Sequence, residues 1–216
     1  MPRPVVFFDF DNTLTQGDVL DEVIERFSPN DSWREWEREW AEGRLSALDC
    51  LRLQVENLRV TRDDLLEYLL SVRIDPAFSA ILACTAARSI ETVIVSDSFL
   101  PLIRHILESN AIGNVPVFAN DLEFEGDRLI PAFPFHDPAF PRSANAKARH
   151  LAPYRGRTVV FAGDGRSDLD AALAADVVFA KDTLARELDA RSRPFHPFGT
   201  LQPVLDYLRT LDEPVD

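Results

Sequence analysis

The segment FFDFDNTLT, residues 7–15, joins an apolar run to two closely spaced carboxylates. The residues at 5–8, VVFF, favour a β-strand. Side chains alternate along a strand, so Asp9 and Asp11 would share one face while Phe10 turns into the core. Two like charges that close together are unfavourable without a cation or a shared proton. The segment therefore predicts a buried first strand that ends at a cation-binding site.

The composition limits the class of protein. A chain of 216 residues with 46% hydrophobic residues suits one large domain, or one domain with a smaller one inserted. The net charge of −13 disfavours nucleic acid and anionic membranes as partners, whereas a small anionic substrate can still bind beside a local cation. Cys50 and Cys84 fit no metal-ligand or disulfide spacing, and residues 1–10 lack a signal-peptide layout. We therefore expect a cytoplasmic protein with reduced thiols.

Residues 16–75 show helical periodicity and no strand pattern. Asp18 can cap a first helix that extends to residue 27, and Asp31 or Ser32 can cap a second. Further helices are expected from 46 and over 61–70. Trp33, Trp36 and Trp40 recur at helical spacing, which indicates the interior of this segment. The pattern predicts a small helical bundle inserted after the first strand.

After residue 75, strand patterns alternate with helical ones. Helices are expected over 77–88, 100–109, 144–151 and 167–175 and in the tail; strands are expected over 91–95, 115–119, 157–162 and 177–180, with a hairpin over 122–132 and an irregular loop over 133–142. Such alternation is typical of a doubly wound parallel sheet. The predicted fold class is therefore α/β, with a Rossmann-like parallel-sheet core over 1–15 and 76–216 and a helical cap over 16–75.

Polar side chains follow the ends of several predicted strands, where open α/β sheets bind ligands. They comprise residues 9–13, Ser96, Lys147 and the segment GDGRSD at 163–168. Carboxylates around an oxygen-lined pocket suit Mg²⁺. One further carboxylate can attack phosphorus and a second can transfer protons, while a hydroxyl and an ammonium hold the phosphoryl oxygens. The set predicts a magnesium-dependent site that acts on a phosphate.

This ordered set of motifs resembles the haloacid dehalogenase superfamily over essentially the whole chain, and the helical insert is similar to that superfamily's first-position cap. The resemblance implies that Asp9 is the nucleophile and becomes a phospho-aspartate. It implies that Asp11 is the general acid and base, and that its main-chain carbonyl also binds Mg²⁺. The resemblance assigns the remaining roles as follows: Asp9, Asp11 and Asp164 as metal ligands, Asp168 as a metal ligand or a support for the ligands, and Ser96, Lys147 and Thr13 as phosphate-binding residues.

Two segments, 18–27 and 177–198, resemble the branch that contains phosphoserine phosphatases and the methionine-salvage phosphatase for 2-hydroxy-3-keto-5-methylthiopentenyl 1-phosphate. The second segment favours the methionine-salvage enzyme. The run Ser96-Asp97-Ser98 departs from the glycines usual in that branch, and is closer to phosphocholine/phosphoethanolamine and pyridoxal-phosphate phosphatases. No cap arginine matches the one that serine-specific members use for the substrate carboxylate. The resemblance therefore implies a small phosphorylated metabolite as substrate.

Alternatives from other classes remain open. A phosphomutase would share every motif, and a phospho-receiver signalling module also combines acidic residues with a lysine. A dehalogenase needs no metal-binding partner for its nucleophile, so the presence of Asp11 and Asp164 argues against that activity. Candidate specificity residues are Asp18, Asp97 and Arg166, although Asp18 could simply cap its helix and Arg166 could lie on the surface. Two further groups are expected to be structural or solvent-exposed: Asp21, Glu22 and Glu25, and the four histidines at 105, 136, 150 and 196.

Overall fold

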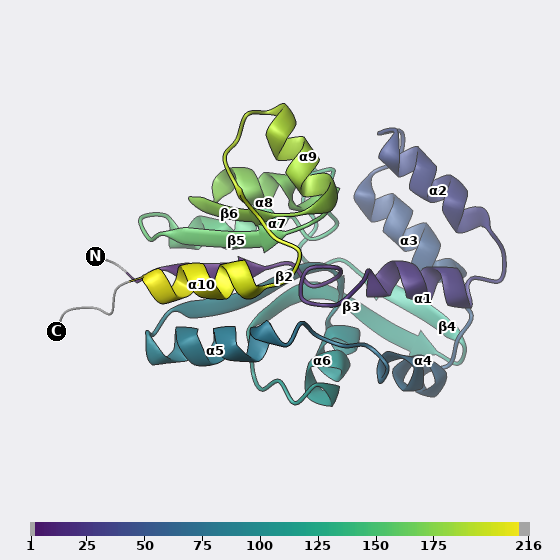
Figure 1. Ribbon diagram of the computed structural model, residues 1–216. Coiled ribbons are helices and arrows are strands. Elements are labelled where there is room, and N and C mark those ends of the chain that lie inside the picture. The colour runs from purple at the N-terminus through teal and green to yellow at the C-terminus, as the bar shows by residue number, and fades with distance from the viewer. Residues whose placement is uncertain (1–2, 212–216) are drawn as a thin grey trace.

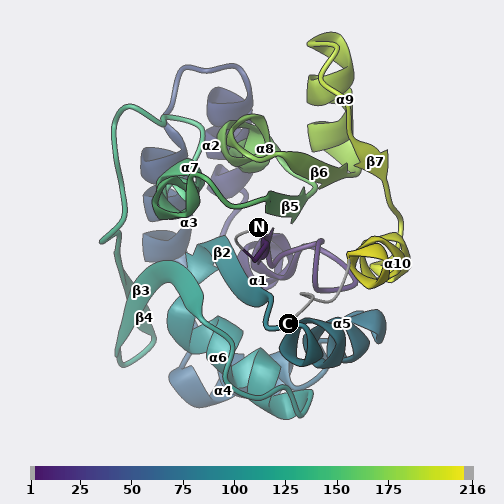
Figure 2. The same ribbon diagram turned by 90° about the vertical axis from the view of Figure 1, so that its left-hand side faces the viewer.

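The computed structural model describes residues 3–211, which form a seven-stranded sheet with helices on both faces (Figures 1 and 2). The strand order is β4-β3-β2-β1-β5-β6-β7, and every neighbouring pair is parallel except β3 and β4. The strands are β1 (Val5–Phe8), β2 (Glu91–Phe99), β3 (Val117–Glu125), β4 (Arg128–Ala132), β5 (Val159–Gly163), β6 (Val177–Ala180) and β7 (His196–Pro197). The predicted α/β fold class is confirmed.

β1 lies in the middle of the sheet, and this position explains its uninterrupted apolar sequence. Val6 and Phe8 belong to the apolar cluster on one face, whereas Val5 and Phe7 belong to the cluster on the other. All four are fully buried. A parallel strand with helices on both faces buries every side chain. The carboxyl end of β1 therefore places Asp9 in the interior.

Helices cover both faces of the sheet. One face carries α5 (Ala77–Ala87), α6 (Leu100–Ser109) and α10 (Gln202–Thr210), and the other carries α7 (Lys147–Leu151), α8 (Leu169–Ala174) and α9 (Asp182–Ala190) (Figure 2). Two short 3₁₀ turns, η1 (Ala152–Tyr154) and η2 (Arg166–Asp168), precede β5 and α8. Within residues 3–211, no helix combines the length and the apolar character that crossing a bilayer requires.

Four helices lie between β1 and α5: α1 (Val19–Phe27), α2 (Ser32–Ala41), α3 (Ala47–Asn57) and α4 (Arg62–Leu69). The side chains of Asp18, Ser46 and Thr61 accept hydrogen bonds from the first turns of α1, α3 and α4, as the sequence predicts. The insert begins and ends at one place, because Thr15 and Ile74 form an antiparallel bridge.

The inserted helices do not all pack together. α2 packs on α3, while α3 also contacts β4 and α4 contacts α6. Apolar residues of the insert, such as Val23 and Leu65, belong to the same cluster as Phe8 of the sheet. The helices therefore lie at the carboxyl edge of the sheet (Figure 1), where they can cover a site. The division into core and cap stays a proposal.

Several details of the sequence prediction differ from the structure. β2 does not end before Ser96 but continues to Phe99, with a shift of register between Val95 and Phe99. The strand expected over 115–119 is continuous with the first strand of the hairpin. The three tryptophans are not buried, since α2 has no buried residue. The short edge strand β7 has no counterpart in the prediction.

Candidate active site

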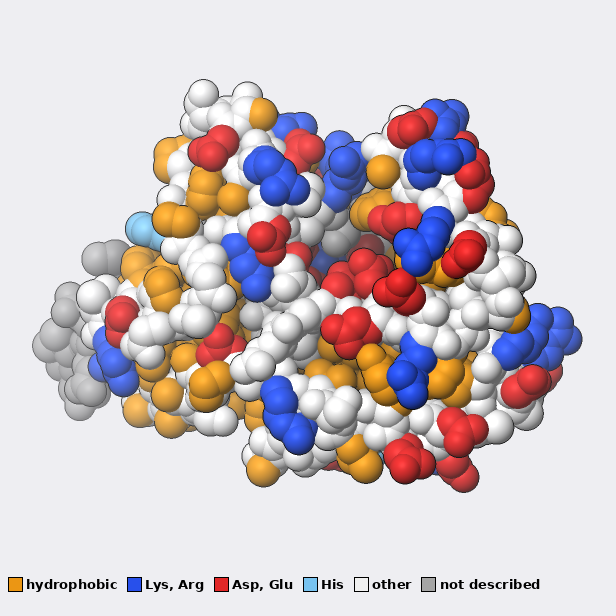
Figure 3. Space-filling view, turned by 45° about the vertical axis from the view of Figure 1, so that its right-hand side comes forward, with side chains coloured by type: hydrophobic (Ala, Val, Ile, Leu, Met, Phe, Trp, Pro, Cys, Tyr) orange, Lys and Arg blue, Asp and Glu red, His pale blue; other side chains and the backbone are white. Residues whose placement is uncertain are grey.

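A cavity of about 160 Å³ lies between the carboxyl ends of the strands and the inserted helices. Figure 3 shows this hollowed face, with acidic side chains gathered below the gap. The predicted site residues that line the cavity are Asp9, Asp11, Asp18, Ser96, Asp97, Lys147, Asp164 and Arg166. Thr13 and Asp168 are buried and do not line the cavity, but each contacts a residue that does: Thr13 contacts Asp164, and Asp168 contacts Lys147. The fold thus brings together segments that are far apart in the sequence.

Lys147 is the central cation of the site. Its Nζ lies 2.6 Å from Oδ1 of Asp9, 2.6 Å from Oδ1 of Asp168 and 3.2 Å from Oγ of Ser167. Burial alone lowers the pKa of Lys147, but the carboxylates of Asp168 and Asp9 outweigh it and raise the pKa well above its ordinary value. Lys147 is therefore a permanent positive charge beside Asp9.

Asp168 is bonded through both carboxylate oxygens. Oδ1 accepts from Lys147, and Oδ2 accepts from the backbone N–H groups of Asp164 and Gly165 at 3.0 and 2.9 Å. Its side chain is fully buried. A Cβ on Gly163 would lie 2.6 Å from this same Oδ2, so only glycine fits there. These contacts favour a supporting role for Asp168 over a direct ligand role.

A group of carboxylate oxygens could hold a cation. One oxygen each from Asp9, Asp164 and Asp168 lie within 4.8 Å of one another. Asp164 is held by Thr13, whose Oγ1 donates to Oδ1 at 3.0 Å, and by Asn12, whose Nδ2 donates to Oδ2 at 2.8 Å. Burial, followed by the charge of Asp168, raises the pKa of Asp164 to about 6. The carboxylates of Asp9 and Asp164, with Asp168 supporting them, suit a hard divalent cation, of the kind that binds one or two carboxylates together with water and phosphate oxygens.

Thr13 therefore contacts Asp164 and not the cavity in this structure. Its predicted contact with phosphate stays a prediction. Ser96 lines the cavity, where its Oγ accepts from the N–H of Ser98 at 3.0 Å and lies 3.4 Å from Oδ2 of Asp11. A phosphate in the cavity could take this hydroxyl as a donor.

Asp11 faces the inserted helices. Its Oδ1 accepts from the N–H of Leu20 at 3.3 Å. Burial, and secondly the charge of Asp18, raises the pKa of Asp11 well above its ordinary value. Its carboxylate is not part of the group around Asp164. Asp11 can thus hold a proton on the side of the cavity from which a leaving group would depart.

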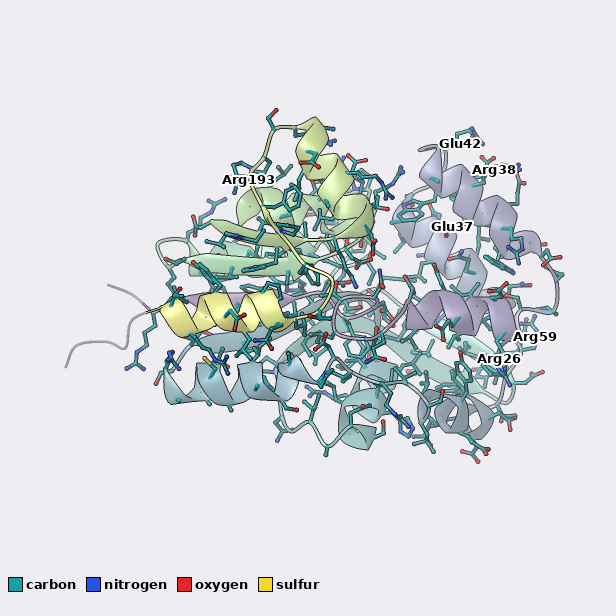
Figure 4. All side chains as sticks on the ribbon, in the orientation of Figure 1. Arg26, Glu37, Arg38, Glu42, Arg59 and Arg193 are labelled. Atoms are coloured by element: carbon teal, nitrogen blue, oxygen red, sulfur yellow. The ribbon has the colours of Figure 1, made fainter. Side chains whose placement is uncertain are left out.

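The wall formed by the inserted helices is rich in hydrogen-bond acceptors. Asp18, Asp21 and Glu37 line it, together with the indole of Trp40. Glu37 Oε2 accepts from Nε2 of the buried Gln54 at 3.1 Å, and Figure 4 shows Glu37 on the α3 side of α2. Burial raises the pKa of Asp18 to about 6. Asp21 is exposed, as expected for a solvated helix face, and it also lines the cavity.

Sequence reasoning missed Glu37 and Gln54 and assigned Trp40 to the interior. Local pattern gives no signal for Glu37 or Gln54, because the tertiary arrangement of α2 and α3 decides which residues face the cavity. Arg166 lines the rim, donates to the carbonyl of Ala41 at 2.7 Å and lies over the ring of Trp40. It therefore joins the loop after β5 to the end of α2.

Within residues 3–211, no histidine lines this cavity, and of the two cysteines only Cys50 does. His150 stacks on Phe118 and bonds to Asn145, which agrees with the expected structural role. Both cysteines are free thiols. Burial, followed by Glu37, raises the pKa of Cys50 to about 12, so its thiol stays protonated although it lines the cavity.

The chain is similar to known proteins in sequence and in fold. The chain is 26% identical over 211 residues to a 2-hydroxy-3-keto-5-methylthiopentenyl-1-phosphate phosphatase of Microcystis aeruginosa, which covers 96% of this chain and 99% of that protein. It is 26% identical to the polyol phosphate phosphatase PYP1 of Saccharomyces cerevisiae, over 95% of this chain and 92% of that one. Among solved structures, a phospho-aspartyl intermediate analogue of phosphoserine phosphatase superposes with a TM-score of 0.73 at 20% identity, covering 96% and 99% of the two chains.

The model of one protein family, described as haloacid dehalogenase-like hydrolase, matches residues 6–173. This range contains the acidic motif after β1, Ser96, Lys147 and the loop after β5. The prediction of a hydrolytic enzyme of this family is confirmed, and the phosphatase names of the relatives agree with the predicted reaction. The chain therefore belongs to the haloacid dehalogenase-like hydrolase family.

Proposed function

We propose that the chain is a Mg²⁺-dependent phosphomonoesterase that acts on a small phosphorylated metabolite through an aspartyl phosphate on Asp9. The main support is the position of Asp9: its buried carboxylate lies in the cavity, beside the ammonium of Lys147 and the carboxylates of Asp164 and Asp168. Buried like charges disfavour folding, whereas a phosphoryl-transfer site uses such carboxylates as the nucleophile and as metal ligands. The expected cytoplasmic location is part of this proposal.

Two proton transfers by Asp11 complete the reaction. An oxygen of Asp9 attacks phosphorus while the bond from phosphorus to the ester oxygen breaks, and Asp11 gives its proton to that departing oxygen. The Asp11 carboxylate then takes a proton from a water whose oxygen attacks the phosphorus, which restores Asp9 and releases phosphate. Lys147 and Ser96 offset the negative charge on the transferring group. Mg²⁺ would be held by Asp9, Asp164 and the main-chain carbonyl of Asp11, with support from Asp168, and it would supply the positive charge that lets a phosphate approach these carboxylates.

The wall of the inserted helices narrows the choice of substrate. It presents Asp18, Asp21 and Glu37 as acceptors, so it suits a leaving group with hydroxyl or ammonium donors. In the described part of the chain, Lys147 and Arg166 are the only cations that line the cavity. Arg166 donates to the backbone carbonyl of Ala41, so its guanidinium is engaged and is poorly placed to bind the carboxylate of a substrate. This arrangement disfavours phosphoserine.

The apolar part of the wall fits a leaving group with a hydrocarbon end. Leu20, Ile24 and Leu51 lie beside the carboxylates in the same cavity. A hydroxylated chain that ends in a methylthio group matches both parts, which favours 2-hydroxy-3-keto-5-methylthiopentenyl 1-phosphate as the substrate. A polyol phosphate is the second candidate, because it offers hydroxyl donors and the yeast relative is named for such substrates.

Phosphate release is the test that separates these functions. The purified chain, with Mg²⁺, is assayed on the methylthiopentenyl phosphate, a polyol phosphate, phosphoserine and an aryl phosphate. We expect release from the aryl phosphate and a preference for the first two metabolites over phosphoserine. Isomerisation without release would indicate a phosphomutase. A stable aspartyl phosphate without turnover would indicate a receiver module, and halide release from a haloacid would indicate a dehalogenase.

A further inference from the structure

Both carboxylate oxygens of Asp97 bind the loop that precedes Lys147. Oδ1 accepts from Oγ of Ser143 at 2.6 Å, and Oδ2 accepts from the N–H of Ala144 at 2.9 Å. Ser143 and Ala144 are buried and do not line the cavity. Asp97 does line it, but its acceptor atoms are turned to the protein. A side chain bound in this way is poorly placed to select a leaving group.

A second residue, Asn145, anchors the same loop. The amide of Asn145 is fully buried, and its Nδ2 donates to the carbonyls of Ser96 and Phe118 at 2.5 and 2.8 Å. These carbonyls belong to β2 and β3, so Asn145 bridges two strands. Asn120 on β3 donates to the carbonyl of Asp97 at 2.6 Å. The loop is therefore fixed to the carboxyl ends of the two strands.

The backbone between these anchors and Lys147 is strained. Ala146 has φ of 46°, in the left-handed region that is unfavourable for a residue other than glycine. α7 begins at Lys147 and has only five residues, so it cannot by itself define where its first side chain lies. The anchors on 143–145 hold this turn, and the turn brings Lys147 to the place where its ammonium contacts Asp9 and Asp168.

We propose that Asp97 is a positioning residue: by holding residues 143–144 it places the Lys147 ammonium against the nucleophile and the transferring phosphate. This inference rests on the proposed phosphatase function, in which Lys147 binds the phosphate. It gives Asp97 a role different from the specificity role that the sequence suggests. Charge is secondary in this role, because an asparagine at 97 can accept from the N–H of Ala144 through its oxygen and donate to the hydroxyl of Ser143 through its nitrogen.

The variants Asp97→Ala, Asp97→Asn and Ser143→Ala test the proposal, with Asp121→Ala as a control that removes an exposed carboxylate from β3. An aryl phosphate serves as substrate and inorganic phosphate as the binding probe. We expect Asp97→Ala and Ser143→Ala to lower kcat and to weaken phosphate inhibition, each by tenfold or more. The double variant, Asp97→Ala with Ser143→Ala, should be as active as the less active of the two single variants, because both changes release the same loop. Asp97→Asn and the control should stay within about threefold of wild type, on the premise that hydrogen bonds and not charge position the loop.

Ser143→Ala removes one oxygen from a residue outside the cavity, so it keeps the test valid if Asp97→Ala fails to fold. Wild-type activity and phosphate inhibition in Ser143→Ala would overturn the inference. So would equal losses in Asp97→Asn and Asp97→Ala on one metabolite with none on the aryl phosphate, since Asp97 would then read the leaving group by charge. If the wild-type chain neither hydrolyses aryl phosphate nor binds phosphate, the proposed function itself fails, and this inference with it.

Discussion

Lys147 and Asp9 form a buried ion pair, with 2.6 Å between Nζ and Oδ1 and 2% and 7% of the two side chains exposed. Lys147 makes an equally short contact with Asp168, so one ammonium faces two carboxylates. Burial and the charge of Asp168 raise the pKa of Asp9, and the ammonium opposes this shift. A nucleophile in such surroundings needs further positive charge to stay ionised while a phosphate approaches.

Asp9→Asn should abolish turnover while the fold persists. The amide keeps the size and the contact to Lys147 but cannot form an acyl phosphate, so phosphate release should fall by at least about 10⁴-fold. Steady-state assays on an aryl phosphate measure the loss, and circular dichroism checks the fold. Asp11→Asn should also be nearly inactive, through lost proton transfer. Full activity in Asp9→Asn would exclude Asp9 as the nucleophile.

Removal of divalent metal should abolish activity. The carboxylates of Asp9, Asp164 and Asp168 converge, so a bound cation stabilises the native state by mass action. We expect Mg²⁺ to restore turnover after chelation and to raise the Tm in proportion to the logarithm of its concentration. Ca²⁺ should raise the Tm but support little turnover, because it prefers more ligands and longer distances. Undiminished turnover in excess chelator would refute the metal requirement.

The pH dependence of stability follows from Asp18, whose pKa burial raises to about 6 from an unfolded value of 3.8. The native state binds the proton of the Asp18 carboxyl more tightly than the unfolded state does. Protonation of Asp18 therefore stabilises the native state fully below about pH 4, and this stabilisation is lost as the pH rises through about 6. Asp18→Asn keeps the helix cap without the charge. The free energy of unfolding, measured with urea in the presence of chelator at pH 7.5, should be higher in Asp18→Asn than in wild type by about 1 kcal/mol, after allowance for solvent screening.

At pH 4 the advantage of Asp18→Asn should disappear, because Asp18 is then protonated in the native state. An equal difference at both pH values would show that the variant acts through packing and not through charge.

Gly163→Ala should disrupt the site from within. A Cβ would lie 2.6 Å from Oδ2 of Asp168 and 2.8 Å from Cε1 of Phe161, and both neighbours are fully buried. We expect a loss of about 1–3 kcal/mol in the free energy of unfolding, as for other overpacked cores. Gly165→Ala is the matched control, because the nearest atom to its Cβ is 3.7 Å away. Thermal unfolding of both variants compares them, and equal stabilities would contradict the close approach.

The parts of the fold that local sequence determines could be predicted. Asp18, Ser46 and Thr61 cap helices in the structure because a cap depends only on the next three residues. The acidic motif after β1 could be located because a parallel strand buried on both faces has a continuous apolar sequence with an abrupt end. The short spacing between Asp9 and Asp11 then indicated a cation site.

What depends on tertiary contacts could not be predicted. The polar run after Val95 looks like the end of a strand, yet β2 continues because Phe99 pairs with Asn120 on β3. The apolar spacing of the tryptophans indicated an interior, but α2 lies at the edge of the molecule and Trp40 faces the cavity. Glu37 reaches the cavity only through the packing of α2 on α3, and no local pattern encodes that packing.

Glu37→Gln should change the choice of substrate without changing the chemistry. Glu37 lines the leaving-group wall and accepts from Gln54, and glutamine can keep that hydrogen bond while losing the charge. With a preferred metabolite whose hydroxyl groups face this wall, kcat/KM should fall by about tenfold, because a hydrogen bond to a carboxylate is stronger by about 1 kcal/mol than one to a neutral amide. Hydrolysis of an aryl phosphate should stay within about twofold of wild type, because Asp9 and Asp11 are unchanged.

Glu42→Gln provides the control, since Glu42 pairs with Arg44 at the outer end of α2 (Figure 4) and does not line the cavity. Parallel losses on both substrates, or the same result in both variants, would exclude Glu37 as a residue that reads the leaving group.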